Sequence, residues 1–287
     1  MKKLWKAFAV CCAIAMLGSA FTACKSDDDD DDGDKKPVET TVSNGQTVGS
    51  YEAPIFAGDF YPANESTDAF IDTDLYVAYA SDIEINTEAT EKVTIYAGDA
   101  LVDEIAVKGE SYDVAGCNKS VQAVKVDDQL VQAVGKVLVI KPHALLTAGT
   151  EYTVTVPEGI VKGQAAKNWK FTPKAIATPT ENTFTVGTDC ASINGALQYL
   201  MSNNSTGDWT INVPAGDYHE ILGYYHATPV NLKIKGADDN GKYGSKSRVF
   251  WRNNTNMGNS QRTRQSFIWD GGNLTIENMT FCNTSNR

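Results

Sequence analysis

The chain has 287 residues, is 42% hydrophobic and carries a net charge of −11 at pH 7. This length suffices for two domains, and a composition with 23 Gly, 12 Tyr and ordinary apolar content excludes a chain that is disordered throughout. The acidic balance excludes nucleic acid as a main partner, since phosphate binding needs basic surface.

The first 23 residues have the pattern of a secretory signal peptide. Three Lys precede a short apolar run at 7–17, which is too short for a stable membrane-spanning helix. Residues 21–24, Phe-Thr-Ala-Cys, resemble the lipobox of bacterial lipoproteins, although Phe21 replaces the usual Leu. The resemblance implies that Cys24 carries a lipid and begins the mature chain, whereas plain cleavage would leave Cys24 unmodified.

Residues 24–50 are predicted to be a disordered tether. Six consecutive Asp at 27–32 repel one another and cannot form a packed core. An acidic run after a lipidated Cys resembles the surface-export signal of Bacteroidetes-type lipoproteins, and a simple spacer is the alternative. Both place the protein in the cell envelope, anchored to the outer membrane at Cys24, at the surface or in the periplasm. No metal is expected, because a flexible Asp run offers calcium no fixed geometry.

Residues 51–175 are predicted to form an antiparallel Ig-like β-sandwich. Short runs that alternate apolar and polar residues are separated by Gly, Pro, Asn and Asp, which is typical of strands and turns. The runs are 74–80, 91–98, 101–109, 135–142 and 151–159. The segment 138–174 resembles bacterial Ig-like domains, which space or present a neighbouring domain. The residues that carry this resemblance include Gly149, Tyr152, Val154, Val156, Gly159, Gly163, Trp169 and Phe171.

No catalytic set is visible in this predicted sandwich. His143 is interpreted as a surface or capped imidazole beside a turn. Trp169 is interpreted as a core residue, with carbohydrate binding through it or through exposed tyrosines as the alternative. Residues 176–182, which contain Pro, Thr and Asn, are expected to be a linker.

Residues 183–287 begin with a short strand at 183–187 and an amphipathic helix at 191–204. Ser192 is a plausible N-cap of this helix. The apolar face has helical spacing and consists of Ile193, Ala196, Leu197, Leu200 and Met201. Because this helix stands before a series of strands, it is predicted to cover the open end of whatever the strands build.

Short apolar runs after the helix predict the first coils of a right-handed parallel β-helix. The runs are 210–213, 231–236, 247–251, 266–269 and 274–281. Their spacing suits stacked coils, whose first open end must be covered because edges and core would otherwise face water. The chain is therefore predicted to be all-β, an Ig-like antiparallel sandwich followed by a parallel β-helix with an N-terminal capping helix.

The segment Pro214-Ala-Gly-Asp-Tyr-His-Glu220 follows the run that ends at Val213. Pro214 cannot donate to a strand ladder, so it ends the strand, and the Gly permits a turn. With Leu232-Lys-Ile-Lys-Gly236, this segment resembles the start of pectin methylesterases, which are β-helical carbohydrate esterases. Residues 266–286 resemble a later motif of the same family, with Asn273 and Leu274 as departures. The residues that align with this motif without a gap are Ser266, Phe267, Gly271, Leu274, Asn278, Thr280, Phe281, Asn283 and Thr284.

The resemblance implies hydrolysis of galacturonate methyl esters in pectin. The family uses one Asp as nucleophile, a second Asp as acid and base, a Gln pair at the oxyanion and an orienting Arg, with no metal or cofactor. These residues are expected downstream of Arg287, so no catalytic residue is assigned. The 287 residues are expected to be an inactive N-terminal portion of a longer protein. The acids interpreted as turn residues are Asp217, Asp238, Asp239 and Asp270.

Residues 240–269 contain six basic residues and no acidic residue. De-esterified pectin is a polyanion, so a basic face would attract it, and a solvated loop without a ligand is the alternative. The residues expected to contact pectin or polygalacturonate are Arg248, Arg252, Arg262, Thr263, Arg264 and Ser266. His219 and His226 are interpreted as surface groups, since no carboxylate or nucleophile is spaced to use them.

Cys117, Cys190 and Cys282 lie far apart and lack the spacing of metal ligands. They are interpreted as separate buried thiols, and a disulfide within one pair stays open. Two other functions also stay open: another β-helical polysaccharide enzyme, such as a pectate lyase, and a non-enzymatic envelope module that binds glycan or protein.

Overall fold

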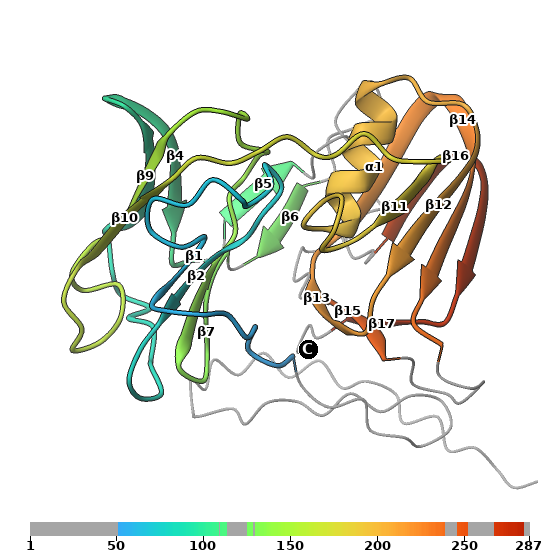
Figure 1. The fold of residues 1–287 in the computed structure, drawn as a ribbon. Helices are drawn as coiled ribbons and strands as arrows, with labels where there is room; N and C mark the ends of the chain where they lie inside the picture. The colour runs from blue at the N-terminus through green and yellow to red at the C-terminus, as the bar shows by residue number, and fades with distance from the viewer. Residues whose placement is uncertain are drawn as a thin grey trace, which may run out of the picture. The chain divides into compact units, whose positions relative to one another are not determined.

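The computed structural model describes two β-rich regions joined in one compact unit (Figure 1). The described residues are 51–108, 110–113, 125–128, 130–238, 246–251 and 267–283. The predicted signal peptide, Cys24 and the acidic tether lie outside them, and the predicted domain boundaries stay predictions. Within the described residues, no helix combines the length and the apolar character that crossing a bilayer needs.

The first region is an antiparallel sandwich of two four-stranded sheets. One sheet has the order β1-β2-β8-β7, with β1 at Phe60–Tyr61, β2 at Leu75–Ala78, β8 at Val137–Ile140 and β7 at Val131–Val134. The other has the order β10-β9-β3-β4, with β10 at Lys167–Phe171, β9 at Tyr152–Val156, β3 at Lys92–Ala97 and β4 at Ala100–Ala106. A separate pair joins β5 at Glu110–Asp113 to β6 at Lys125–Asp128. The antiparallel sandwich predicted from alternation is confirmed.

Alternation of buried and exposed residues explains how the two sheets pack. In β2 and β9 every second side chain is buried, which places their apolar faces in one shared core. Trp169 is 1% exposed and stacks on Phe60 with ring centroids 4.9 Å apart, so its predicted place in the core is confirmed.

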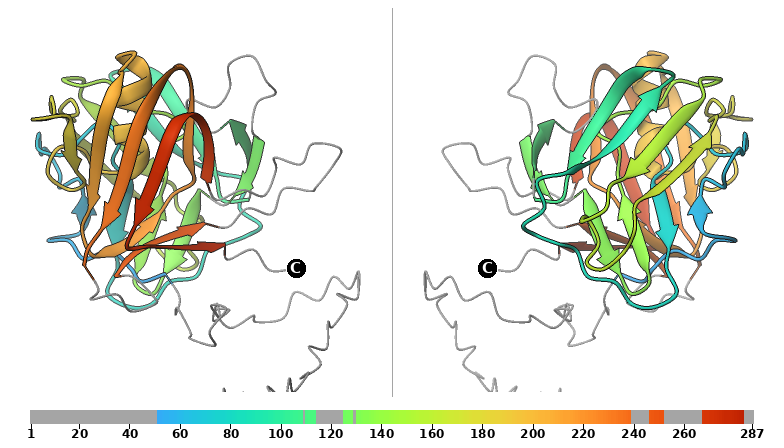
Figure 2. Two further views of the ribbon diagram at one scale, coloured as in Figure 1. Left: turned by 90° about the vertical axis from the view of Figure 1, so that its right-hand side faces the viewer. Right: turned by 90° about the vertical axis from the view of Figure 1, so that its left-hand side faces the viewer.

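The second region consists of stacked parallel strands. One sheet has the order β11-β12-β14-β16, with β11 at Thr183–Thr185, β12 at Gly207–Val213, β14 at Leu222–Gly236 and β16 at Phe267–Glu277. A second has the order β13-β15-β17, with β13 at Gly216–His219, β15 at Ser247–Trp251 and β17 at Met279–Asn283. The chain passes from one sheet to the other in each rung, and Figure 2 shows the first sheet curling. The predicted partial parallel β-helix is confirmed.

Equivalent residues of successive rungs stack into columns. Phe184 pairs with Ile211, Ile211 with Ile234, and Ile234 with Ile276. The first three side chains are fully buried, whereas Ile276 on the last described strand of this sheet is 41% exposed. Each rung thus buries the apolar surface of its neighbour, which is how a stacked coil gains stability.

The helix α1 spans Ile193–Ser202 and packs against β12 and β14, as Figure 1 shows. Its predicted apolar face is buried in full. Ser192 is the N-cap, and its hydroxyl accepts a hydrogen bond from the Gly195 N–H at 2.8 Å. The helix therefore closes the first rung, as its position in the sequence predicts.

The interpretation of the segment after Val213 was partly wrong. Pro214 does end β12, but Gly216–His219 is itself a strand, β13, and not only a turn. Asp217 therefore lies within a strand, as does Asp270 in β16, so neither is a turn acid. His219 is 9% exposed and is not a surface group, because it lies where β13 meets residues of the sandwich.

Candidate functional site at the N-terminus of the helix

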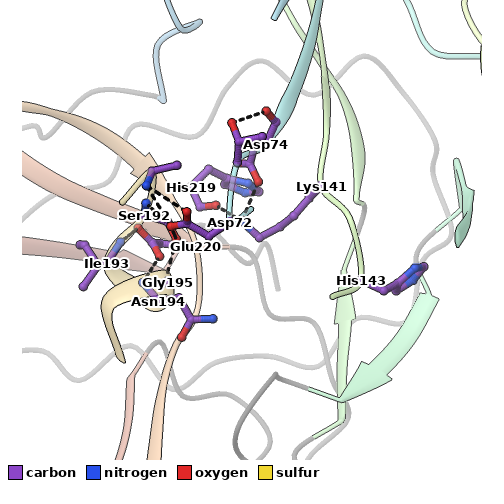
Figure 3. Close-up of polar contacts among 12 residues, drawn as sticks. Asp72, Asp74, Lys141, His143, Ser192, Ile193, Asn194, Gly195, His219 and Glu220 are labelled. Atoms are coloured by element: carbon purple, nitrogen blue, oxygen red, sulfur yellow. Dashed lines mark hydrogen bonds and ion pairs between the residues drawn. The ribbon is translucent and has the colours of Figure 1, made fainter. Parts of the chain in front are cut away.

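Two carboxylates, one from the segment before β2 and one from the residue after β13, meet the first turn of α1 (Figure 3). Glu220, which follows β13, accepts hydrogen bonds from the Ile193 N–H at 3.1 Å and the Asn194 N–H at 2.8 Å. The first amides of a helix have no partner within it and carry a partial positive charge, so an anion there is favourable. The last residue of the Pro214–Glu220 motif is thus a cap for the helix.

Asp72 supplies the second carboxylate, from the sandwich segment just before β2. It accepts hydrogen bonds from the Ala191 N–H at 3.0 Å, the Ser192 N–H at 2.7 Å and the Ser192 hydroxyl at 2.8 Å. Asp72 is 9% exposed, so these bonds replace water that the carboxylate loses. We call Asp72, Glu220 and the amides of 191–194 the α1 joint.

Gly195 makes the approach of Asp72 possible. A Cβ built at position 195 would overlap the carboxylate of Asp72. Position 195 is also where a Glu would complete a capping box that starts at Ser192. Because Gly195 has no side chain, the joint takes its carboxylates from Asp72 and Glu220 instead.

Lys141, which follows β8 in the β1-β2-β8-β7 sheet, links this sheet to the end of β13. Its Nζ lies 3.2 Å from Asp74 Oδ1 and donates to the carbonyl oxygen of His219 at 2.9 Å. The His219 ring packs on Tyr51, with centroids 5.3 Å apart, and its Nε2 lies 3.3 Å from the amide nitrogen of Gln132. Burial, with the nearby Lys141 charge, lowers the pKa of His219 to about 3, so the neutral ring accepts the Gln132 N–H.

Burial dominates the titration of the carboxylates at the joint. It raises the pKa of Glu220 to about 7, although Lys141 and the Asn194 and Ile193 amides favour the ionised form. Burial also raises the pKa values of Asp72 and Asp74, against hydrogen bonds to Asp72 and the Lys141 charge beside Asp74. Each carboxylate is held by named donors, so the arrangement is a structural joint and not an acid–base pair.

A cavity of about 530 Å³ lies beside the α1 joint. Its wall includes charged groups of the joint and several aromatic side chains. The aromatic residues are Tyr51, Phe56, Tyr61, Phe70, Tyr76 and Tyr218, and the charged or titratable residues are Asp68, Asp72, Asp74, Lys141, Lys174, Asp217, His219 and Glu220. This volume falls in the range of small-molecule sites in proteins.

Of the residues expected to contact pectin, only Arg248 lies among the described residues. Arg252, Arg262, Thr263, Arg264 and Ser266 lie outside them, so their predicted role stays a prediction. Arg287 also lies outside the described residues. The expectation that the catalytic residues of the esterase family follow Arg287 is therefore not tested by the structure and stays a prediction.

The side chain of Arg248 is held by an acid of the neighbouring rung. Its Nε and Nη2 donate to the two oxygens of Asp217 at 2.6 and 2.7 Å, in a fork that matches the carboxylate. The pair is largely buried, with 21% and 9% of the two side chains exposed. The charge of Arg248 is therefore neutralised by Asp217 within the protein, whereas the neighbouring Lys246 is exposed.

The other polar candidates lie elsewhere or have structural partners. His143 sits apart from the joint in Figure 3, where its backbone N–H and its Nδ1 both meet the carboxylate of Asp103, at 2.9 and 2.7 Å. Cys190 and Cys282 are buried, unbridged thiols whose pKa values are raised by burial. In the part of the chain that the structure describes, no cluster of His, Cys, Asp and Glu could hold a metal ion.

Comparison with known proteins places the first region in a named class. Residues 52–186 match the model of the bacterial Ig-like domain family, and this match extends over β11. No curated protein matches the chain. A solved catalytic domain of a GH87 alpha-1,3-glucanase in complex with tetrasaccharides shares 15% identity over 75% of this chain and 44% of that one, with a TM-score of 0.18. The chain thus spans less than half of that domain, and a score this low does not indicate a shared fold.

The sequence did not reveal Asp72, Asp74 and Lys141 as members of the joint or its surroundings. All three stand next to buried strands, at Phe70-Ile-Asp-Thr-Asp and at the end of β8, which is a signal for polar groups at an edge. The missing Glu at position 195 was a second signal, because it left the amides of the helix without a local carboxylate.

Proposed function

We propose that this chain is the N-terminal, pectin-binding part of a pectin methylesterase-type carbohydrate esterase of the cell envelope. The observation that carries the proposal is the place of the Pro214–Glu220 motif in the rungs. Tyr218 donates its hydroxyl to the Pro214 carbonyl at 3.0 Å, and Glu220 caps α1. The motif thus builds the capped first rung that the resemblance to this esterase family implies.

The residues around this motif support a structural role for it. Ser247 is fully buried, and its hydroxyl lies 2.8 Å from the Val213 carbonyl and 3.0 Å from that of Pro214. The same hydroxyl accepts the Ala237 N–H at 2.8 Å, so three successive segments of two rungs meet at one side chain. A motif with these contacts determines the shape of the rung, and we assign it no catalytic role.

The carboxylates of the α1 joint and the nearby Asp74 support a structural role for these acids. Asp72 and Glu220 hold helix amides and Asp74 holds Lys141, so these three groups are committed to the fold. A nucleophile for ester hydrolysis must instead reach the substrate with a free oxygen and an oriented acid nearby. We therefore propose that these residues position the rungs and that pectin binds along their surface.

The proposal also includes a cellular location, the outer membrane, and a binding partner, pectin. Lipidation at Cys24 would hold the protein at the outer membrane, and the basic stretch 242–264 would contact de-esterified units of pectin through charge. Because Arg248 is paired with Asp217, the contribution of this stretch is expected from its other basic residues, including the exposed Lys246.

Retention by polysaccharide tests this function. The purified chain is run in native gels that contain low-ester pectin or, as a control, dextran, and methanol release from methylated pectin is measured in parallel. We expect pectin to retard the protein, with salt and the Lys242→Ala/Lys246→Ala change weakening retardation, and no methanol release. A matched Lys92→Ala/Lys108→Ala variant, altered in the sandwich, should behave as wild type. Equal migration in pectin and dextran would refute pectin binding, and methanol release would refute the non-catalytic assignment.

A further inference from the structure

The outer face of the sheet β13-β15-β17 carries two buried apolar side chains. Side chains alternate between the two faces of a strand, and Val249 and Phe281 pack into the core inside the rungs. Their neighbours Phe250 and Cys282 therefore point away from that core, and they form a separate cluster in which they are 0% and 2% exposed. We call this pair, which lies side by side in the β15–β17 register, the outer column. Apolar side chains on the outside of the rungs stay dry only if another segment covers them.

The segment 51–56, which we call the strap, covers the outer column. Tyr51 packs on this cluster, and the centroid of its ring lies 6.0 Å from that of Phe250. The backbone N–H of Glu52 donates to Asp217 Oδ2 on β13 at 3.1 Å. A ring contact and a hydrogen bond thus hold this end of the strap on the rungs, and the ring shields the outer column from water.

The other end of the strap rests on the sandwich, and its middle stands between two cavities. Phe56 packs on Tyr76 and Tyr61, with ring centroids 5.7 and 6.4 Å apart. Ile55 is fully exposed and, with Asp217, lines both the cavity of about 530 Å³ beside the α1 joint and a second cavity of about 720 Å³. Because the strap belongs to no helix or strand, the contacts at its two ends hold it in place as the partition between these cavities.

We propose that the strap is releasable, and that its end contacts keep the outer column sealed and the two cavities apart. On release, Tyr51 leaves the outer column, the Glu52 N–H leaves Asp217, and the two cavities join into one groove. Segments with few buried contacts and no regular structure are the ones that open locally in folded proteins. The sandwich and the rungs stay joined, because the α1 joint uses other residues. Release does not depend on which ligand the rungs bind, so it goes beyond the proposed function.

The Cys282 thiol reports release, because the strap covers it. The full chain is labelled with N-ethylmaleimide at increasing urea concentrations, and each thiol is followed by peptide mass spectrometry. Cys190, which is 0% exposed in the core inside the rungs, reports global unfolding. We expect the opening free energy at Cys282 to be smaller and less dependent on urea than that at Cys190. The Glu52 amide should exchange with deuterium at the same opening free energy as Cys282, while the β17 amides stay protected.

Two substitutions separate release of the strap from a general loss of stability. Phe56→Ala removes the contact on the sandwich and should speed Cys282 labelling by on the order of tenfold, since an aromatic contact is lost. Ile211→Val, in the core inside the rungs, should speed Cys190 labelling and leave Cys282 labelling unchanged.

Three results would overturn the releasable strap. The first is equal opening free energies and equal urea dependence at Cys282 and Cys190 in the wild type, which would mean that only global unfolding exposes either thiol. The second is Cys282 labelling that Phe56→Ala does not change or that Ile211→Val speeds as much as it speeds Cys190. The third is exchange of the β17 amides together with Cys282 labelling, which would show that the strand itself frays. Failure to bind pectin would overturn the proposed function and leave the strap standing.

Discussion

Gly195→Ala is the substitution that most sharply tests how the sandwich and the first rung are joined. A methyl group at this position would overlap the Asp72 carboxylate and displace it from three donors on Ala191 and Ser192. A hydrogen bond to a charged group contributes about 1.5–3 kcal/mol, and partial relaxation keeps the total loss below the sum of three. Ala also stabilises a helix by about 1 kcal/mol relative to Gly. We therefore expect a net loss of about 2–4 kcal/mol in the free energy of unfolding.

Urea unfolding of four proteins measures this effect: wild type, Gly195→Ala, Asp72→Ala and the double variant. When residue 72 is Ala, the overlap is gone and only the helix propensity remains. Gly195→Ala should then be neutral or should stabilise the protein by up to about 1 kcal/mol. A loss of the same size in both backgrounds would refute the close approach of Asp72 as the reason for Gly195.

Three further changes probe the ion pair, the buried cap and the column of rungs. Arg248→Ala should lower the unfolding free energy by about 1–3 kcal/mol in urea titrations, because it removes the charged partner of the largely buried Asp217, which still accepts the Glu52 N–H at 3.1 Å. Lys233→Ala, from a half-exposed pair, should change the unfolding free energy by less than about 1 kcal/mol, and equal effects of the two substitutions would contradict this. Burial raises the pKa of Glu220 to about 7, so the ionised form is disfavoured in the folded state. Wild-type stability relative to Glu220→Gln should therefore be greatest below about pH 4.5 and should fall by on the order of 1–3 kcal/mol as the pH rises through about 7, and a difference that does not vary with pH would oppose this. Ile234→Ala should destabilise the protein by about 2–5 kcal/mol in thermal or urea unfolding, and a change below about 1 kcal/mol would speak against a packed column.

Most of the fold predictions that the structure confirms came from the local spacing of apolar residues. The buried face of α1 and its cap at Ser192 depend on residues within one or two turns, so spacing alone identified them. The rungs could be predicted because each one contributes a short apolar strand to the same sheet. β13 was missed since its first three residues are only half-buried and its Gly, Asp and Tyr resemble turn residues.

The long-range contacts could not be derived from spacing. Asp72 reaches Ser192 across 120 residues, and no local pattern links the two. The Arg248–Asp217 pair is different, because these residues lie opposite each other in the β13–β15 register. Had Gly216–His219 been recognised as a strand, stacking of rungs would have predicted that pair and removed Arg248 from the basic face.

Amide hydrogen exchange at the start of α1 tests most directly whether the two regions meet there. The first amides of a helix normally exchange freely, since they have no partner within the helix. We expect the amides of Ala191 to Asn194 to be protected in the wild type. Asp72→Ala should release Ala191 and Ser192 first, and Glu220→Ala should release Ile193 and Asn194 first. Fast exchange of all four amides in the wild type, or protection that neither substitution alters, would contradict a joint built from both carboxylates.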